Sequence, residues 1–333
     1  MKKFLYAFTG FILLLIIVYF LGPKPKTPQF DTALPAIPEQ PSALGDYVRQ
    51  KEHRHKIKPG NEAEIVWADS AHSLTPYAFA YLHGFSASKI EGDPVHRQLA
   101  KAFGANLYLA RLAEQGIDTV DAMKNFTPEN QWASAREAYA IGKKLGKKVV
   151  VIGCSTGGTL ALKLAATYPD IAGLILISPN IAINNPSAFL LNDPWGKQIA
   201  EKVFGGDNRV VDGKSPDYQK YWYTRYHVNA VVQLEELVES TMTAETFRAV
   251  KQPVLTVFYY KDQEHQDDVV RVDKMHGMMK ALSTPGNMKI EKSVPNGGNH
   301  VLGSSVTSKD WKSVLVAAED FCREKLKMSS KSE

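Results

Sequence analysis

The chain reads Val-Val-Val-Ile-Gly-Cys-Ser-Thr-Gly-Gly from Val149 to Gly158, so a β-branched run meets a Gly-x-Ser-x-Gly motif. Residues 159–166 follow as Thr-Leu-Ala-Leu-Lys-Leu-Ala-Ala, a composition that favours a helix. In a strand–turn–helix setting, glycines let the backbone turn sharply and lift the serine above the strand end. We therefore predict that Ser155 is a nucleophile. The alternative is a glycine-rich turn with a structural role only.

Short apolar runs alternate with amphipathic stretches through the rest of the chain. The expected strands are residues 63–68, 77–82, 106–110, 148–153, 173–178, 254–260 and 288–294, and the expected helices are 94–103, 128–145, 158–168 and 308–327. Residues 173–178 are apolar without alternation, as expected for a strand covered on both faces. The alternation indicates βαβ units and a mostly parallel sheet.

Polar loops follow four of the expected strands. They are His-Gly-Phe-Ser-Ala-Ser at 83–88, the Ser155 turn, Lys-Asp-Gln-Glu-His-Gln-Asp-Asp at 261–268 and Pro-Asn-Gly-Gly-Asn-His at 295–300. In a parallel sheet the ligand site lies beyond the carboxyl ends of the strands. Serine, acid and histidine thus come in the chain order expected for a nucleophile elbow on such a sheet.

On these motifs the sequence resembles the α/β-hydrolase superfamily, in particular its serine esterase and lipase-like branch. The resemblance covers about residues 62–327 and rests on Leu-His-Gly-Phe at 82–85, Gly-Cys-Ser-Thr-Gly-Gly at 153–158, Gln-Pro-Val-Leu at 252–255 and Gly-Asn-His at 298–300. The loop at 111–116 departs from it, because it lacks the Gly-His-Gly of many relatives. The resemblance implies an α/β-hydrolase fold: a mostly parallel central sheet flanked by helices, with a helical cap inserted before the acid-bearing strand.

The predicted catalytic roles are those of a Ser-His-Asp triad. The Ser155 hydroxyl needs a base to remove its proton, and His300 is the candidate base. An acid must orient His300 and stabilise its charged form. Asp267 begins Asp-Asp-Val-Val, which matches the family pattern of an aspartate, any residue and two apolar residues, so we favour Asp267. Asp262, directly after the expected strand, is the alternative acid.

The resemblance also implies an oxyanion hole and a cap. Fixed N–H donors stabilise the charge that develops on an attacked carbonyl oxygen, and by family position they are the backbone amides of Phe85 and Thr156. Residues 179–252 exceed the length of one crossover helix, and the resemblance implies a cap at about residues 180–250. Its aromatic residues form either the core of the cap or the wall of an apolar pocket. They are Tyr218, Tyr221, Trp222, Tyr223 and Tyr226.

The N-terminal stretch at residues 4–21 is uncharged and strongly apolar. A helix of this length spans about 27 Å, enough to cross the hydrocarbon core of a membrane. A cleaved signal peptide is the alternative, but Tyr-Phe-Leu-Gly-Pro at 19–23 lacks the small residues of a cleavage site. We expect a retained transmembrane anchor over residues 1–22, with the catalytic domain on the exported, periplasmic or extracytoplasmic side. Lysines flank both ends, so the positive-inside rule gives little guidance on orientation.

A proline-rich spacer and a basic leader, residues 23–60, precede the hydrolase domain expected at 61–333. Six prolines between residues 22 and 41 favour an extended, semi-rigid chain. The basic residues that follow either favour anionic lipid head groups or belong to a helix packed on the domain. Residues 1–60 hold nine Lys and Arg against four Asp and Glu, which is the net +5 of the whole chain. The domain is therefore nearly neutral, and we expect no nucleic-acid partner.

The remaining composition indicates no cofactor and no metal. The two cysteines, Cys154 and Cys322, are too few for a disulfide framework, and His53 and His55 lack carboxylates at ligand spacing. We predict a membrane-anchored serine hydrolase that cleaves a small-molecule or lipid carboxylic ester through an acyl-serine intermediate. A lipase, lysophospholipase, thioesterase or amidase with the same triad is an alternative. A non-catalytic binding protein of this fold is another, and the oligomeric state stays open.

Overall fold

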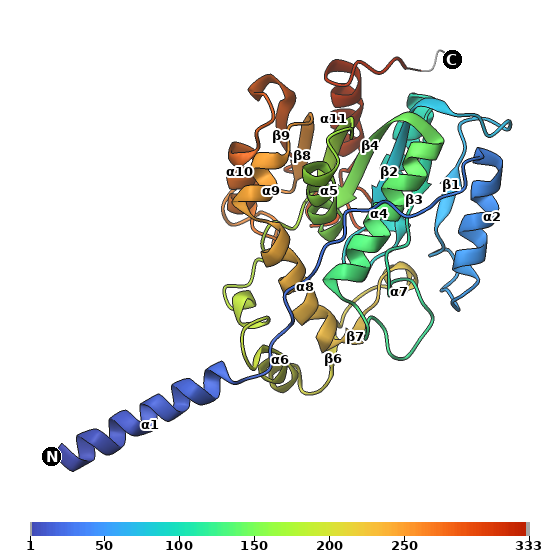
Figure 1. Ribbon diagram of the computed structural model, residues 1–333. Coiled ribbons are helices and arrows are strands. Elements are labelled where there is room, and N and C mark those ends of the chain that lie inside the picture. Colours follow the sequence, from blue (N-terminus) through green and yellow to red (C-terminus); the bar gives the residue numbers. More distant parts are fainter. Residues whose placement is uncertain (1, 331–333) are drawn as a thin grey trace.

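A seven-stranded sheet forms the centre of the molecule in the computed structural model, which describes residues 2–330 (Figure 1). Its order is β1-β3-β2-β4-β5-β8-β9, and every neighbouring pair is parallel except β1 with β3. The strands are β1 (Glu64–Val66), β2 (Thr75–Leu82), β3 (Asn106–Leu109), β4 (Gly146–Cys154), β5 (Gly173–Ile177), β8 (Val254–Phe258) and β9 (Lys289–Ser293). The predicted mostly parallel sheet is confirmed.

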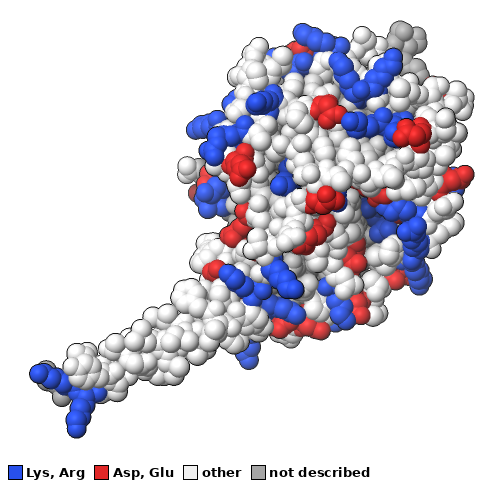
Figure 2. All heavy atoms as spheres, in the orientation of Figure 1, with Lys and Arg blue, Asp and Glu red and all other residues white. Residues whose placement is uncertain are grey.

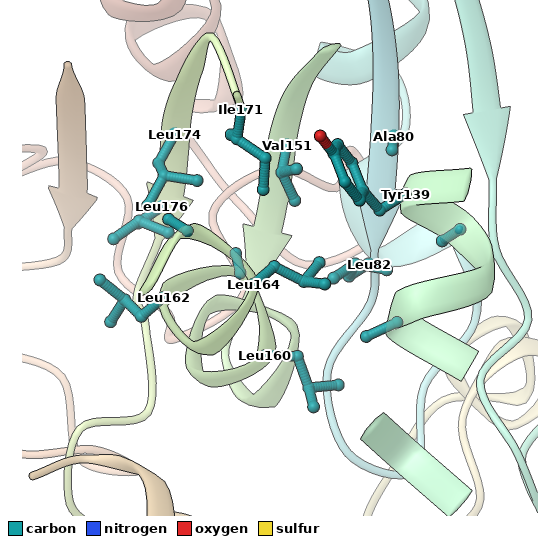
Figure 3. Packing of buried hydrophobic residues seen from close by; sticks show 14 of the residues in the cluster. Ala80, Leu82, Tyr139, Val151, Leu160, Leu162, Leu164, Ile171, Leu174 and Leu176 are labelled. Atoms are coloured by element: carbon teal, nitrogen blue, oxygen red, sulfur yellow. The ribbon is translucent and has the colours of Figure 1, made fainter. Parts of the chain in front are cut away.

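Helices cover both faces of this sheet, and each face has its own apolar core. On one face Leu82 and Val151 pack against α4 (Pro128–Leu145) and α5 (Thr156–Thr167), as Figure 3 shows. On the other face Phe79 and Ile152 pack with residues of α3 (Val95–Ala102) and α11 (Trp311–Glu324). Alternate residues of a strand point to opposite faces, which is why strands buried on both sides are apolar throughout.

The limits of α4 agree with the predicted helix because its ends carry strong local signals. Thr127 and Asn130 form a capping box, and Pro128 occupies the first helical position. By contrast, α10 (Val272–Ala281), whose range was not predicted, has no side-chain cap at its N-terminus. Its Gly277 lowers helix propensity, and buried packing of Val272, Met275, Met278 and Met279 stabilises it instead.

The segment between β5 and β8 rises over the carboxyl ends of the strands. It contains η2 (Ala188–Leu190), α6 (Gly196–Phe204), the β6–β7 hairpin (Asn208–Val210 and Arg225–His227), α7 (Pro216–Tyr221) and α8 (Val228–Thr241). The last helix of the segment, α9 (Ala244–Ala249), contacts α5 and α10, so it lies in the helical layer of the body. The short 3₁₀ helices η1 (Lys89–Gly92) and η3 (Gly286–Met288) complete the fold.

The N-terminal region consists of the exposed helix α1 (Lys2–Phe20), an extended segment and α2 (Pro41–Glu52). The extended segment, residues 22–39, has no regular secondary structure, in agreement with its prolines. It lies against the body as a strap rather than standing free: the indole of Trp132 donates to the Asp31 carbonyl at 2.6 Å, and Arg136 pairs with Asp31 at 2.7 Å. Ile37 is buried in the core. The basic leader contains a helix, α2, that packs on α4.

Candidate active site

Ser155 lies in the sharp turn between β4 and α5. Its backbone has φ 51° and ψ −118°, and residues other than glycine rarely adopt a positive φ. The Ser155 amide donates to the Ile177 carbonyl at 3.0 Å, which ties the turn to β5. A Cβ on Gly157 would lie 2.0 Å from the Leu82 carbonyl oxygen, so only glycine fits there. The motif therefore holds the serine at the carboxyl end of the central strand.

The loop after β2 lies beside this turn. A Cβ on Gly84 would approach the Ser155 Cβ to 2.9 Å, so the loop and the serine are in direct contact. Thr156 is the first residue of α5, whose initial N–H groups have no partner within the helix. Among the described residues, neither the Phe85 nor the Thr156 amide donates to an acceptor of the protein. Both predicted oxyanion donors are thus unengaged.

His300, in the loop after β9, is hydrogen-bonded to Asp267, in the loop after β8. The His300 Nδ1 and the Asp267 Oδ2 are 2.7 Å apart, and both side chains are buried. The Asp267 Oδ1 accepts from the amides of Val269 and Val270 at 3.0 and 3.1 Å. When neutral His300 donates its Nδ1–H hydrogen bond to Asp267, its Nε2 is unprotonated. This Nε2 has no hydrogen-bond partner within residues 2–330.

Electrostatics couple these two side chains. Burial alone would lower the pKa of His300, but the nearby Asp267 carboxylate outweighs burial and raises it. Burial alone would raise the pKa of Asp267, yet His300 and the two loop amides lower it. The arrangement stabilises an imidazolium beside a carboxylate, the charge state that forms when a histidine accepts a proton from serine.

The alternative acid lies elsewhere. Asp262 is exposed, and its Oδ1 is 2.8 Å from the Nδ1 of His265. The same oxygen accepts from the amides of Glu264 and His265 at 3.0 and 2.8 Å. The structure therefore brings Asp267, and not Asp262, to His300.

His83 braces the loop after β2. Its Nε2 accepts from the Leu112 amide at 3.1 Å, so its Nδ1 carries the proton and donates to the Gly84 carbonyl at 2.9 Å. Burial lowers the pKa of His83 to about 4, which keeps the ring neutral. Loop 111–116 contributes the Leu112 amide, so the segment that departs from the family pattern supports the loop after β2, where the oxyanion hole was predicted.

Residues of the segment between β5 and β8 cover the site. The Phe85 ring lies edge to face with Tyr226, with centroids 5.2 Å apart, and the Tyr223 amide donates to the Ser86 carbonyl at 2.8 Å. Trp222 packs against Val301, the neighbour of His300. Only 6% of Ser155 is exposed. The aromatic residues of the segment between β5 and β8 thus pack among themselves and also contact the loops that carry Phe85 and His300.

Comparison with known proteins identifies the family. The model of the family "Serine aminopeptidase, S33" matches residues 135–284. A thermostable monoacylglycerol lipase of Bacillus sp. (strain H-257) is 31% identical over 179 residues, which cover 54% of this chain and 67% of the lipase. The chain belongs to the α/β-hydrolase superfamily. Within it, this hydrolase falls in the esterase and lipase-like branch and is a carboxylic ester hydrolase, as predicted.

Solved structures agree on the fold of this α/β-hydrolase. A lipolytic enzyme from the study of the metagenome-derived LipS and LipT superposes with a TM-score of 0.64 at 19% identity, over 81% of this chain and all of that one. The monoacylglycerol lipase of Paleococcus ferrophilus gives a TM-score of 0.56 at 15% identity, over 80% and 98% of the two chains. The predicted α/β-hydrolase fold is confirmed.

Sequence reasoning overlooked one buried residue of this hydrolase near the site. Glu91 in η1 is 2% exposed, and its Oε2 accepts from the Gly84 amide. No motif surrounds it, and a glutamate after a loop is ordinarily solvated. Only its separation of seven residues from Gly84, within a short loop, indicates that the two could meet. Cys154 and Cys322 are both buried and free of disulfides.

Proposed function

We propose that this hydrolase is a membrane-anchored enzyme that cleaves carboxylic esters of lipids through an acyl-serine on Ser155. The observation that carries the proposal is the His300–Asp267 hydrogen bond at 2.7 Å, which leaves the His300 Nε2 unprotonated and without a partner within the described residues. This nitrogen is free to accept the serine proton. In unliganded enzymes the serine–histidine hydrogen bond often forms only with substrate bound.

In the proposed reaction, His300 removes the proton of Ser155 as its Oγ attacks the acyl carbonyl carbon. The amides of Phe85 and Thr156 then stabilise the negative charge on the carbonyl oxygen. The tetrahedral intermediate collapses as His300 returns the proton to the leaving alcohol oxygen. Water repeats the sequence on the acyl-serine: His300 takes its proton, the C–O bond to Ser155 breaks, and the serine is protonated as the acid leaves.

The surface where α1 meets the body supports a lipid ester as the substrate. The end of α1 contacts the cap at Trp195, whose amide and indole donate to the carbonyls of Pro23 and Val18 at 2.9 and 3.1 Å. The adjacent helix α6 exposes Ile199 and Val203. Figure 2 shows Lys and Arg side chains, with Asp and Glu side chains beside them, where α1 meets the body. Apolar side chains among basic ones suit a surface that rests on anionic lipid.

The membrane anchor rests on α1 itself. It is 19 residues long with a mean hydropathy of 2.1, and none of its candidate span is buried in the body. A helix of this length spans about 28 Å. Retention in the membrane pellet after an alkaline wash, with the N-terminus intact, is expected. Release of a protein that begins after residue 22 would contradict the anchor, and protease protection of the catalytic domain in spheroplasts would contradict the exported side.

The activity is tested with the full chain in detergent micelles. p-Nitrophenyl esters of rising acyl length and a monoacylglycerol are compared, with an aminoacyl amide as the control for peptidase activity. We expect hydrolysis of both ester types, and labelling by a fluorophosphonate, to disappear in Ser155→Ala. Turnover and labelling that persist in Ser155→Ala would refute the assignment, and a preference for the amide would refute the ester. Activity restricted to soluble short-chain esters would refute the lipid substrate.

A further inference from the structure

Gly84 joins two peptide planes of the oxyanion loop, and each plane is held by a different buried side chain. The Glu91 carboxylate accepts the Gly84 N–H, which belongs to the plane that His83 and Gly84 share. His83 donates to the Gly84 carbonyl at 2.9 Å, which belongs to the plane that contains the Phe85 N–H. Carbonyl and N–H point in opposite directions across a trans peptide, so fixing the first fixes the second.

We propose that Glu91 is a positioning residue for the oxyanion hole: together with His83 it clamps Gly84 and so sets the direction of the Phe85 N–H. Glycine has the greatest backbone freedom of any residue, so without both clamps this loop has several accessible conformations. Because Gly84 lies so close to Ser155, a small change in the direction of the Phe85 N–H would move it away from the carbonyl oxygen of a substrate bound at Ser155. The inference rests on the proposed function, because it assigns Phe85 as an oxyanion donor.

A purely structural role does not account for the burial of the Glu91 carboxyl. A buried carboxyl is costly unless a cation pairs with it, but the nearby cations Lys89 and Arg97 both pair with Glu64, at 2.8 and 2.7 Å. Among described residues, no lysine or arginine forms a salt bridge with Glu91. Burial raises the pKa of Glu91 to about 7, and the Gly84 amide opposes that rise. A costly group is thus retained where it meets the catalytic loop.

Glu91 also acts on His300 through charge. The titratable or polar groups that face its carboxyl come from β2, the Ser155 turn, the cap and the loop after β9. They are Tyr81, Cys154, Tyr218, Trp222 and His300. The Glu91 anion raises the pKa of His300, after the larger effects of burial and Asp267. Glu91 therefore has two separable effects: it accepts the Gly84 amide, and it stabilises the His300 imidazolium.

Two substitutions separate these effects. Glu91→Ala removes both the acceptor and the charge, whereas Glu91→Gln keeps an acceptor oxygen for the Gly84 amide. We expect Glu91→Ala to lower kcat by about 10- to 100-fold, less than the loss of an oxyanion donor itself. KM should stay within about threefold, and affinity for a trifluoromethyl ketone, which mimics the tetrahedral intermediate, should fall with kcat. Glu91→Gln should keep kcat within about fivefold and move the acid limb of kcat/KM to lower pH.

Glu235→Gln is the matched control, because Glu235 is also a buried carboxyl whose pKa burial raises to about 7, but it lies in α8. It should leave kcat and the acid limb unchanged. A folded Glu91→Ala with wild-type kcat and ketone affinity would overturn the proposal. If Glu91→Ala does not fold, Glu91→Leu, which also lacks an acceptor, takes its place, and a folded Glu91→Leu with wild-type kcat and ketone affinity would overturn the proposal. Ser155→Ala is assayed alongside to separate this result from failure of the proposed function. If Glu91→Ala has wild-type activity and Ser155→Ala is inactive, only the positioning role of Glu91 is refuted.

Discussion

The segment after β8 supplies two aspartates, each paired with a histidine, in different surroundings. Asp262 and His265 are 2.8 Å apart, and their side chains are 50% and 57% exposed. Asp267 and His300 are 2.7 Å apart, and their side chains are 0% and 8% exposed. The hydrogen bonds have nearly the same length, so the distance does not distinguish the pairs. Their surroundings do: the Asp262–His265 pair is solvated, and the Asp267–His300 pair is buried.

This difference shows why contact alone does not identify a candidate catalytic pair. In water, two charges 4 Å apart attract by only about 1 kcal/mol, and salt screens them. In a site with little water the same carboxylate holds a histidine in one tautomer and one orientation. The amides of Val269 and Val270 fix Asp267 in turn. We therefore expect substitutions in the two pairs to differ strongly in their effects on turnover, stability and pH dependence.

The largest expected difference is in turnover. Asp267→Asn should lower kcat by about 10³- to 10⁴-fold, because an asparagine amide favours the wrong histidine tautomer. Asp262→Asn should stay within about twofold of the wild type. Both are measured with the same p-nitrophenyl ester, with circular dichroism as a check that each variant is folded. Comparable losses in the two variants would remove the distinction between the pairs.

Stability should show the next largest difference. Asp267→Ala leaves His300 buried without its anion, and we expect the free energy of unfolding to fall by about 3 kcal/mol. Asp262→Ala should leave the urea midpoint nearly unchanged, because water solvates both partners. Equal midpoints for the two alanine variants would show that burial adds nothing to the Asp267 pair.

The stability that the buried pair contributes should depend on pH in a defined way. The lowered pKa of Asp267 adds stability above about pH 4, and this is lost as the pH falls through its folded pKa. The raised pKa of His300 adds stability below about pH 6.5, and this is lost as the pH rises through its folded pKa. Urea titrations of the wild type and Asp267→Asn should therefore differ most between about pH 4 and 6.5. A difference that grows above pH 8 would contradict the pairing.

The pH profile of catalysis gives a smaller effect. His300 must be neutral to act as a base, and its pKa is raised, so the acid limb of kcat/KM should lie above about pH 6.5. In Asp267→Asn the residual activity should have its acid limb at lower pH. His265→Ala should leave the profile in place and change kcat/KM by less than about twofold. A shifted profile in His265→Ala would show that the exposed pair reaches the site.

The sequence predicted those parts of the structure that have strong local causes. The capping box of α4, the apolar run of β5 and the glycines around Ser155 act within a few residues, and each element forms where expected. The Asp-Asp-Val-Val pattern also has a local basis, because the Asp267 Oδ1 binds the two valine amides. The catalytic roles of these residues stay predictions until they are tested.

Features with distant causes were not predicted. Glu91 is buried because η1 lies beneath the loop after β2, and nothing in its own neighbourhood in the sequence indicates this. The prolines of residues 22–39 predict an extended chain but not where it lies. Its position depends on Trp132 and Arg136, about a hundred residues further along the chain. Contacts of this kind form only when tertiary structure brings the partners together.

The docked strap restricts how the enzyme could meet its substrate. A free chain over residues 21–40 would reach about 70 Å and let the body tumble above a membrane. Here Asp31 binds Arg136, Lys144 binds Glu39, and Trp195 contacts the end of α1. These contacts hold the body close to the end of α1. With α1 in a bilayer, the cap would stay at the lipid surface. Esters would then arrive by lateral diffusion in the lipid layer, and the rate would follow their surface density rather than their bulk concentration.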